Sequence, residues 1–318
     1  MLRPGAAVAL WGVLCVCAAL FGGLKVHGSR GYAAIVVAFA VLVAGELWLA
    51  APEMRDKMTR LSGVQGGVLV ALWPLATYLI YAVGSGSFAW WRFGIATAYA
   101  LVPVALAATA HNHSAGAWQD YAAMLAIYGG YRWLPFLFSD PTLSYLFSVL
   151  FAINVALAAF VLVRRLEGIG YSIGWRLAWI GTISLNFAVI VAIDVPLGIA
   201  IHFVRFEPGG TQWRTLPLAL LGILAFTAWP EEFLFRGLLQ NLLGKSLRNE
   251  NAGWLLASVI FGFSHILHGT FPNWRYVLLA TIAGLFYGLT WRKTGSIFPA
   301  AVVHTLVDTS WHLFFRTL

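Results

Sequence analysis

Long apolar stretches, each close to the length of a membrane-spanning helix, recur along almost the whole chain of 318 residues. The hydrocarbon layer of a bilayer is about 30 Å thick and takes about 20 apolar residues to cross as a helix. About eleven stretches reach or approach that length, near residues 5–24, 32–51, 64–83, 93–110, 121–138, 145–163, 175–203, 214–243, 252–267, 275–291 and 296–316. Spanning segments of this length satisfy their backbone polar groups as helices. The sequence therefore predicts an all-α, polytopic membrane bundle of about 11 transmembrane segments.

Composition excludes a soluble protein. Hydrophobic residues make up 60% of the chain and charged residues only 10%, whereas soluble proteins carry about 25% charged residues. A net charge of +8 could indicate nucleic-acid binding, but the basic residues lie between apolar stretches, which is typical of membrane topology. We expect a lipid bilayer and no nucleic acid as partner. Cys15 and Cys17 lie in the first apolar stretch, where they favour apolar packing over a disulfide.

Basic residues also predict an orientation. Four connections that each follow an even-numbered stretch carry clusters of Lys and Arg: Arg55, Lys57 and Arg60; Arg164, Arg165 and Arg176; Lys245 and Arg248; Arg292 and Lys293. All four then lie on one side of the membrane. Because positive loops stay in the cytoplasm, we expect a multi-pass protein of the cell membrane with a cytoplasmic N-terminus.

Two apolar stretches contain interruptions. The fifth holds Gly129, Gly130 and Pro135, and the eighth is too long for one straight span, so that Pro230 should kink it. A polar stretch at 164–176 suggests a boundary. We expect N-terminal transmembrane helices of unassigned role in residues 1–170 and a core that carries the chemistry in residues 171–318.

A pair of carboxylates stands inside the eighth apolar stretch. Glu231 and Glu232 are followed by Arg236, and each ionised group at membrane depth costs about 2.5–3.5 kcal/mol on insertion scales. On a helix Glu232 and Arg236 share a face, while Glu231 lies about 100° round. Arg236 can therefore pair with Glu232 and leave Glu231 to accept a proton from water.

Two later apolar stretches carry polar groups at helical spacing. Phe261 and His265 share one face, and His304 and Asp308 share another, with His312 continuing the stripe. Taken singly, each group has a structural interpretation: a Glu–Arg pair can join helices, and a lone intramembrane His can donate to a backbone carbonyl. Taken together, the three groups of residues, one in each of three apolar stretches, favour one buried polar site.

These segments resemble a known family. WPEEFLFRG, FGFSH and GSIFPAAVVHTLVD are similar to the three motifs of the CPBP intramembrane proteases (CAAX proteases and bacteriocin-processing enzymes, also called the ABI family). The family pattern is two glutamates, three further residues and then Arg; Phe, three further residues and then His; and His, three further residues and then Asn or a similar polar residue. The resemblance covers roughly residues 214–312 and is nearest to the type 2 CAAX prenyl endopeptidase. Gly284 and Gly288 look like the small-residue helix contact of the family.

The resemblance implies an intramembrane endopeptidase with roles for six residues. Glu231 and His265 would polarise the attacking water, Glu232 and Arg236 would fix the site, and His304 with its partner would stabilise the oxyanion. Asp308 stands where the family commonly has Asn. An ionised carboxylate cannot donate to an oxyanion, so Asp308 is either protonated or orients His304; we favour the orienting role. The substrate implied is a membrane-anchored or lipidated protein or peptide.

Alternatives follow from the same residues. Glu231, His265, His304 and Asp308 are compatible with Zn²⁺ in type, but the chain has no H-E-x-x-H, so we expect no cofactor and keep zinc as the alternative. Buried Glu, Asp and His could form the relay of a proton- or ion-coupled transporter, which should show broken helices in two matched halves. A non-catalytic bacteriocin-immunity or assembly factor is the third possibility.

Overall fold

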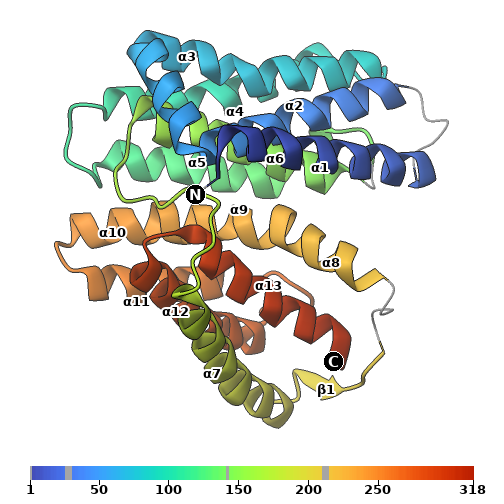
Figure 1. The fold of residues 1–318 in the computed structure, drawn as a ribbon, viewed down its shortest axis with the longest axis vertical. Coiled ribbons are helices and arrows are strands. Elements are labelled where there is room, and N and C mark those ends of the chain that lie inside the picture. Colours follow the sequence, from blue (N-terminus) through green and yellow to red (C-terminus); the bar gives the residue numbers. More distant parts are fainter. Residues whose placement is uncertain (1, 26–30, 141–142, 210–214) are drawn as a thin grey trace. The chain divides into compact units, whose positions relative to one another are not determined.

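The chain folds almost entirely into helices (Figure 1). The computed structural model describes residues 2–25, 31–140, 143–209 and 215–318. They form two compact units, residues 1–167 and 168–318, which divide within the polar stretch 164–176. The predicted all-α class is confirmed, with two three-residue strands as a local addition.

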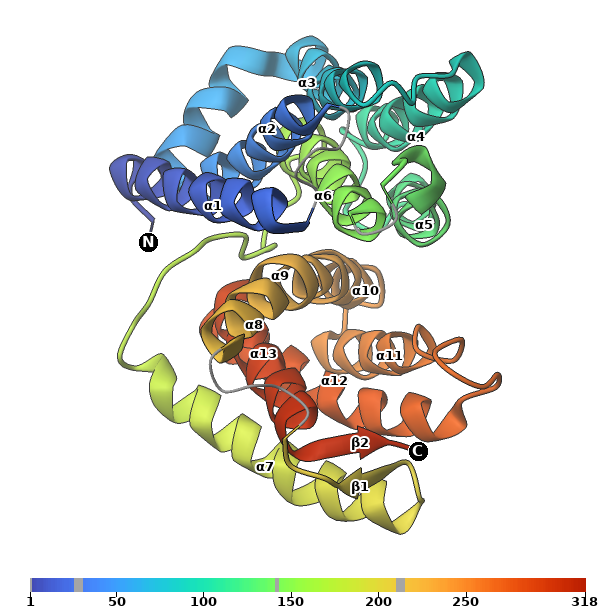
Figure 2. The same ribbon diagram turned by 90° about the vertical axis from the view of Figure 1, so that its right-hand side faces the viewer.

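The first unit is a helical bundle built around α6. Its elements are α1 (Pro4–Lys25), α2 (Tyr32–Ala50), α3 (Pro52–Gly84), α4 (Trp90–Thr109), α5 (Trp118–Trp133) and α6 (Ser144–Ala156), which continues as a π-helix over Leu157–Val163. α6 packs against α2, α3, α4 and α5 (Figure 2). A helix that is apolar on all sides is stable where it is surrounded, and α6 with its π-helical extension is almost completely buried.

Two basic clusters of this unit differ from the sequence expectation. Arg55 and Lys57 do not lie in a loop, because α3 already begins at Pro52. Proline at the first helical position has its φ preset for a helix, and the Lys and Arg residues that follow are good helix formers. Arg164 is buried rather than free: its Nε lies 2.8 Å from Asp120 Oδ1. The positive charge near residue 164 is thus partly neutralised inside the unit.

The second unit contains the motif residues. Its elements are α7 (Trp179–Ala200), β1 (Val204–Phe206), α8 (Leu216–Ile223), α9 (Trp229–Glu232), α10 (Asn241–Ser246), α11 (Glu250–Phe263), α12 (Trp274–Thr294), α13 (Ile297–Phe314) and β2 (Phe315–Thr317). α12 packs on α7, α11 and α13, and α13 also packs on α8 and α9. The motif-bearing helices therefore share one bundle.

α8, α9 and α10 are one continuous helical run from Leu216 to Ser246. Pro230 does not end it; π-helical turns lie on both sides, at Leu224–Ala228 and Phe233–Gln240. Proline lacks a backbone donor, and the wider turns change the hydrogen-bond register around it. In the fifth stretch, α5 stops at Trp133 and a short 3-10 turn follows from Pro135.

The last apolar stretch ends as a strand rather than a helix. β2 pairs antiparallel with β1 in the register Val204↔Thr317, Arg205↔Arg316 and Phe206↔Phe315. Phe203, Val204 and Leu279 are buried together at the start of this ribbon. The ribbon closes the end of the second unit at which α12 begins and α13 ends.

Five of the described helices are long and apolar enough to cross a membrane. They are Tyr32–Ala50, Trp90–Thr109, Ser144–Val163, Trp179–Ala200 and Leu216–Ser246, and Pro4–Leu20 and Leu72–Gly84 are shorter apolar segments. A membrane protein is supported, whereas the predicted number of about 11 spans remains a prediction.

Candidate active site

Glu232 and Arg236 form a buried ion pair inside the second unit. Arg236 Nε lies 3.1 Å from Glu232 Oε2, and both side chains are almost completely inaccessible to solvent. This confirms the pairing expected from their spacing. Arg236 Nη2 also donates to the backbone oxygen of Gly284 on α12, at 3.1 Å. The ion pair therefore ties α9 to α12.

Glu232 also holds His304. The Nδ1 atom of His304 on α13 lies 2.9 Å from Glu232 Oε1. A carboxylate paired with a guanidinium accepts hydrogen bonds, so Nδ1 carries the proton of this contact. Glu232 thus uses one oxygen for Arg236 and the other for His304, and it fixes the ring of His304 relative to α9.

The other ring nitrogen of His304 faces two further carboxylates. Nε2 lies 3.5 Å from Asp308 Oδ2 and 4.0 Å from Glu231 Oε2. Glu231 is 17% exposed and Asp308 is 32% exposed, while Glu232 is 0% exposed. Asp308 therefore lies at Nε2, and Glu232 takes the Nδ1 contact that would set the tautomer. The orienting role that the sequence favours for Asp308 stays a prediction, and Glu232 is a second carboxylate placed to take such a role.

Phe261 is the apolar centre of this cluster. The guanidinium carbon of Arg236 lies 4.3 Å above its ring, and the rings of His265 and His304 lie 4.9 and 5.9 Å away. Arg236 Nη1 has no hydrogen-bond partner among the described residues. A cation over an aromatic face is attracted by the ring quadrupole, which compensates part of that missing bond.

His265 lies just beyond the end of α11. Its Nδ1 is 2.9 Å from the backbone oxygen of Phe261 and 3.1 Å from Ser264 Oγ. A carbonyl oxygen can only accept, so Nδ1 carries the proton and Nε2 of the neutral ring keeps a lone pair. His265 also packs on Tyr276, at 4.6 Å between ring centroids. It joins the cluster through Phe261 rather than through an ion pair with Glu231.

Sequence reasoning missed two tyrosines of α12. Tyr287 stacks on His304 at 4.5 Å and lies 5.3 Å from the Arg236 guanidinium carbon, and Tyr276 packs on His265. Tyrosine in a membrane helix is normally interpreted as an interfacial anchor. The signal for Tyr287 was its place in the middle of an apolar helix, three residues after Gly284.

The glycines expected at helix contacts lie where helices meet. A Cβ on Gly284 would stand 3.0 Å from the Phe261 ring and 3.3 Å from Arg236 Nη2. A Cβ on Gly288 would stand 2.5 Å from Gln240 Oε1. Both positions on α12 therefore admit close neighbours because they lack a side chain.

The zinc alternative can be compared with the geometry. In the part of the chain that the structure describes, no group of three or more His, Cys, Asp or Glu side chains is placed to hold a metal ion.

Comparison with known proteins shows a family to which this part of the chain is similar. Residues 213–310 match the family described as type II CAAX prenyl endopeptidase Rce1-like. Curated proteins and solved structures compared with the chain gave no match. The matched region contains the buried ion pair, His265, His304 and Asp308. Residues 213–310, about a third of the chain, are thus similar to the type II CAAX prenyl endopeptidase Rce1-like family.

Proposed function

We propose that this protein is an intramembrane endopeptidase that hydrolyses a peptide bond of a membrane-associated protein. Two findings support the proposal: the family of residues 213–310, and the sharing of Glu232 between Arg236 and His304. Glu231 is therefore the partly accessible glutamate of the pair. Its side chain is 17% exposed and faces His304 Nε2. A partly accessible carboxylate beside a fixed imidazole is an arrangement suited to general-base chemistry.

In the proposed first step Glu231 removes a proton from a water molecule while the water oxygen attacks the scissile carbonyl carbon. His265 helps to position that water, because its Nδ1 is engaged by the Phe261 carbonyl and its Nε2 can accept. The carbonyl oxygen becomes an oxyanion. Glu231 then returns the proton to the leaving nitrogen as the carbon–nitrogen bond breaks, so the glutamate ends as it began.

His304 is the proposed oxyanion donor. Glu232 accepts from Nδ1, so only Nε2 can reach a substrate. In the proposed scheme His304 is the imidazolium, protonated on both ring nitrogens, and its Nε2 donates toward the reacting oxygen. Asp308 lies 3.5 Å from Nε2 and accepts the hydrogen bond from the Nε2 proton before the substrate enters. The substrate carbonyl then replaces Asp308 as acceptor. These roles need no cofactor, and we propose a glutamate-based mechanism whose activity survives chelation of divalent metals.

The proposed substrate is anchored in the bilayer, as a transmembrane, lipidated or prenylated protein would be, because the site lies on apolar helices that include the candidate span Leu216–Ser246. The cell membrane, with the N-terminus in the cytoplasm, is the proposed location, from the distribution of Lys and Arg.

Cleavage of membrane-anchored reporter peptides by the purified full chain tests this function. Glu231→Gln keeps the shape of the side chain and removes the base, so we expect cleavage to fall by about 10²-fold or more. Glu53→Gln makes the same change in α3, in the other unit, and should leave cleavage intact. Equal thermal unfolding of the two variants would exclude misfolding as the cause. Near-normal cleavage by Glu231→Gln would refute the assigned base, and loss of cleavage on chelation would refute the metal-free scheme.

A further inference from the structure

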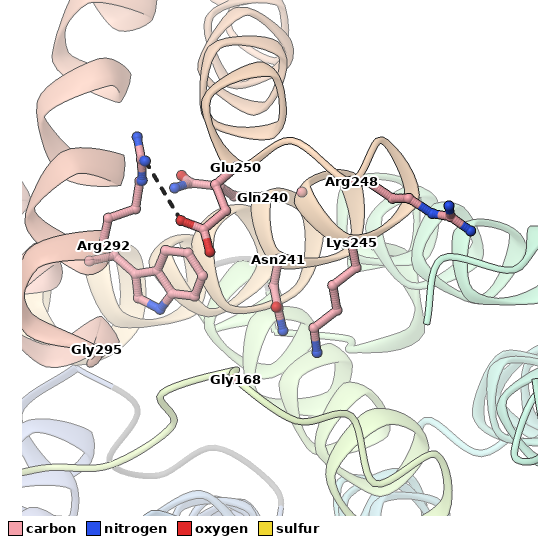
Figure 3. Close-up of a pocket in the computed structure, with 10 residues that line it drawn as sticks. Gly168, Gln240, Asn241, Lys245, Arg248, Glu250, Arg292 and Gly295 are labelled. Atoms are coloured by element: carbon pink, nitrogen blue, oxygen red, sulfur yellow. Dashed lines mark ion pairs between the residues drawn. The ribbon is translucent and has the colours of Figure 1, made fainter. Parts of the chain in front are cut away.

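A polar cavity lies in the second unit, away from the motif residues. It has a volume of about 470 Å³ and forms where the turn between α10 and α11 meets the turn between α12 and α13 (Figure 3). Along the helices, Lys245 lies fourteen residues beyond Glu231 and Glu250 fifteen before His265. At about 1.5 Å per residue these offsets correspond to about 20 Å. The cavity is therefore at the opposite end of these helices from His265.

Charge is concentrated around this cavity. Lys245, Arg248 and Arg292 line it together with one carboxylate, that of Glu250. Arg292 Nη2 lies 3.7 Å from Glu250 Oε2, on one side of the cavity, and Lys245 and Arg248 lie on the other (Figure 3). Three cations against one carboxylate favour an anionic ligand.

The lining also includes a buried acceptor for which the described part of the chain supplies no donor. Gln240 is 3% exposed, and its Nε2 donates to the backbone oxygen of Gly288 at 3.3 Å. Because that oxygen can only accept, the orientation of the amide is fixed, and Oε1 is left as a buried acceptor to which none of the described residues donates a hydrogen bond. Buried acceptors are normally satisfied. A ligand that fits should thus bring a hydrogen-bond donor as well as negative charge.

The position of the cavity indicates where such a ligand comes from. α10 ends at Ser246 and α12 at Thr294, while α11 begins at Glu250 and α13 at Ile297. The cavity therefore lies where apolar helices end, which is the depth of lipid head groups, and Trp291 in its wall is a residue type enriched there. Basic pockets between membrane helices at this depth bind lipid phosphates.

We propose that this cavity binds the head group of an anionic glycerophospholipid whose head group also carries hydroxyl donors. The phosphate lies between Lys245 and Arg248, and a hydroxyl of the head group donates to Gln240 Oε1. Asn241, also in the lining, offers a further polar contact. The acyl chains continue into the bilayer. This proposal does not depend on the peptidase function.

The probe is phosphatidylglycerol, titrated into the detergent-solubilised full chain and followed by native mass spectrometry and by the thermal unfolding temperature. We expect a retained lipid adduct and a rise of a few degrees in the unfolding temperature. Diacylglycerol with the same chains lacks the phosphate and should give neither. Phosphatidylcholine carries no hydroxyl or N–H donor and should bind more weakly. Glycerol 3-phosphate, which has no acyl chains, should be ineffective at the same concentration.

Variants decide whether the lipid occupies this cavity. The double variant Lys245→Gln/Arg248→Gln should raise the apparent Kd for phosphatidylglycerol by about tenfold or more, because it removes two charge-assisted hydrogen bonds. Lys57→Gln/Arg60→Gln on α3 removes the same charge from exposed positions outside the cavity and should change the Kd little. An unchanged Kd in the first variant, or an equal loss in the second, would overturn the proposal. Full stabilisation by glycerol 3-phosphate would overturn the lipid as the source of the phosphate.

Discussion

Tyr287 and His304 lie face to face in the centre of the second unit, with ring centroids 4.5 Å apart and planes inclined by 15°. Glu232 holds one edge of the imidazole through Nδ1. The ring could still tilt about that contact, and the stacked ring of Tyr287 restricts this tilt. Tyr287 is therefore a positioning residue for the proposed oxyanion donor.

Replacement of Tyr287 tests this relationship. Tyr287→Phe keeps the stacked ring and should retain most of the cleavage rate. Tyr287→Leu removes the ring and should lower kcat by about tenfold or more with a smaller change in KM. The reason is that a tilted His304 no longer directs its hydrogen bond at the oxyanion. Steady-state kinetics with a reporter peptide give both constants. A large loss in Tyr287→Phe would instead indicate that the hydroxyl, and not the ring, is required.

Asp308 offers a second test, because it faces His304 Nε2 at 3.5 Å. Asp308→Asn replaces a group that can only accept when ionised by an amide that can also donate. If Asp308 serves to hold the Nε2 proton, the change should lower kcat by about tenfold or more. The measurement is a pH–rate profile of both forms. Full activity of Asp308→Asn across the neutral range would favour the alternative, in which residue 308 is itself a donor.

Gly284 links helix packing to the site. A Cβ at this position would meet the Phe261 ring at 3.0 Å and Arg236 Nη2 at 3.3 Å, so α11 and α12 must separate or the guanidinium must move. We expect Gly284→Ala to destabilise the fold by about 1–3 kcal/mol and to lower cleavage. Gly181→Ala on α7, where a Cβ meets nothing within 4 Å, is the matched control. The two unfolding temperatures in detergent make the comparison, and equal values would contradict the packing argument.

Glu207 beside the β-ribbon predicts a pH dependence. A hydrogen bond from Arg205 lowers the pKa of the Glu207 carboxyl, and Arg316 acts in the same direction. The folded pKa is therefore below the unfolded value of about 4.3. The stabilisation is present above the unfolded pKa and is lost as the pH falls through the folded pKa.

Amide hydrogen exchange in residues 314–318, corrected for the intrinsic effect of pH, should show the ribbon loosening below about pH 4. Glu207→Gln should remove this pH dependence, because the amide does not titrate, whereas Glu53→Gln should preserve it. The same acid-induced loosening in Glu207→Gln would show that another group is responsible.

Helical class and one ion pair were accessible from the sequence because they follow from local rules. Apolar length predicts helices, and the i,i+4 spacing of Glu232 and Arg236 predicts their contact, which is present at 3.1 Å. The contact between Glu232 and His304 spans 72 residues of sequence. No spacing rule reaches that far, so the sequence assigned the orienting role to Asp308, the residue near in sequence.

Other features were hidden because they depend on partners in the fold. The sequence places Arg164 in a basic loop, because its partner Asp120 lies 44 residues away in sequence. β2 lies in an apolar stretch, and only its pairing with β1 makes it a strand. The start of α3 at Pro52 was obscured by the charges that follow, which a hydropathy criterion assigns to a loop.

The π-helical turns on both sides of Pro230 limit how the glutamate motif can be transferred. Each wide turn changes the angle about the helix axis at which later side chains emerge. If the nine residues WPEEFLFRG were copied into a regular α-helix, the motif sequence would be unchanged. The side chain of Arg236 would, however, leave the helix at a different angle relative to the residues before the motif. The portable unit is the whole run from Leu216 to Ser246, together with the glycine face of α12 that receives the guanidinium.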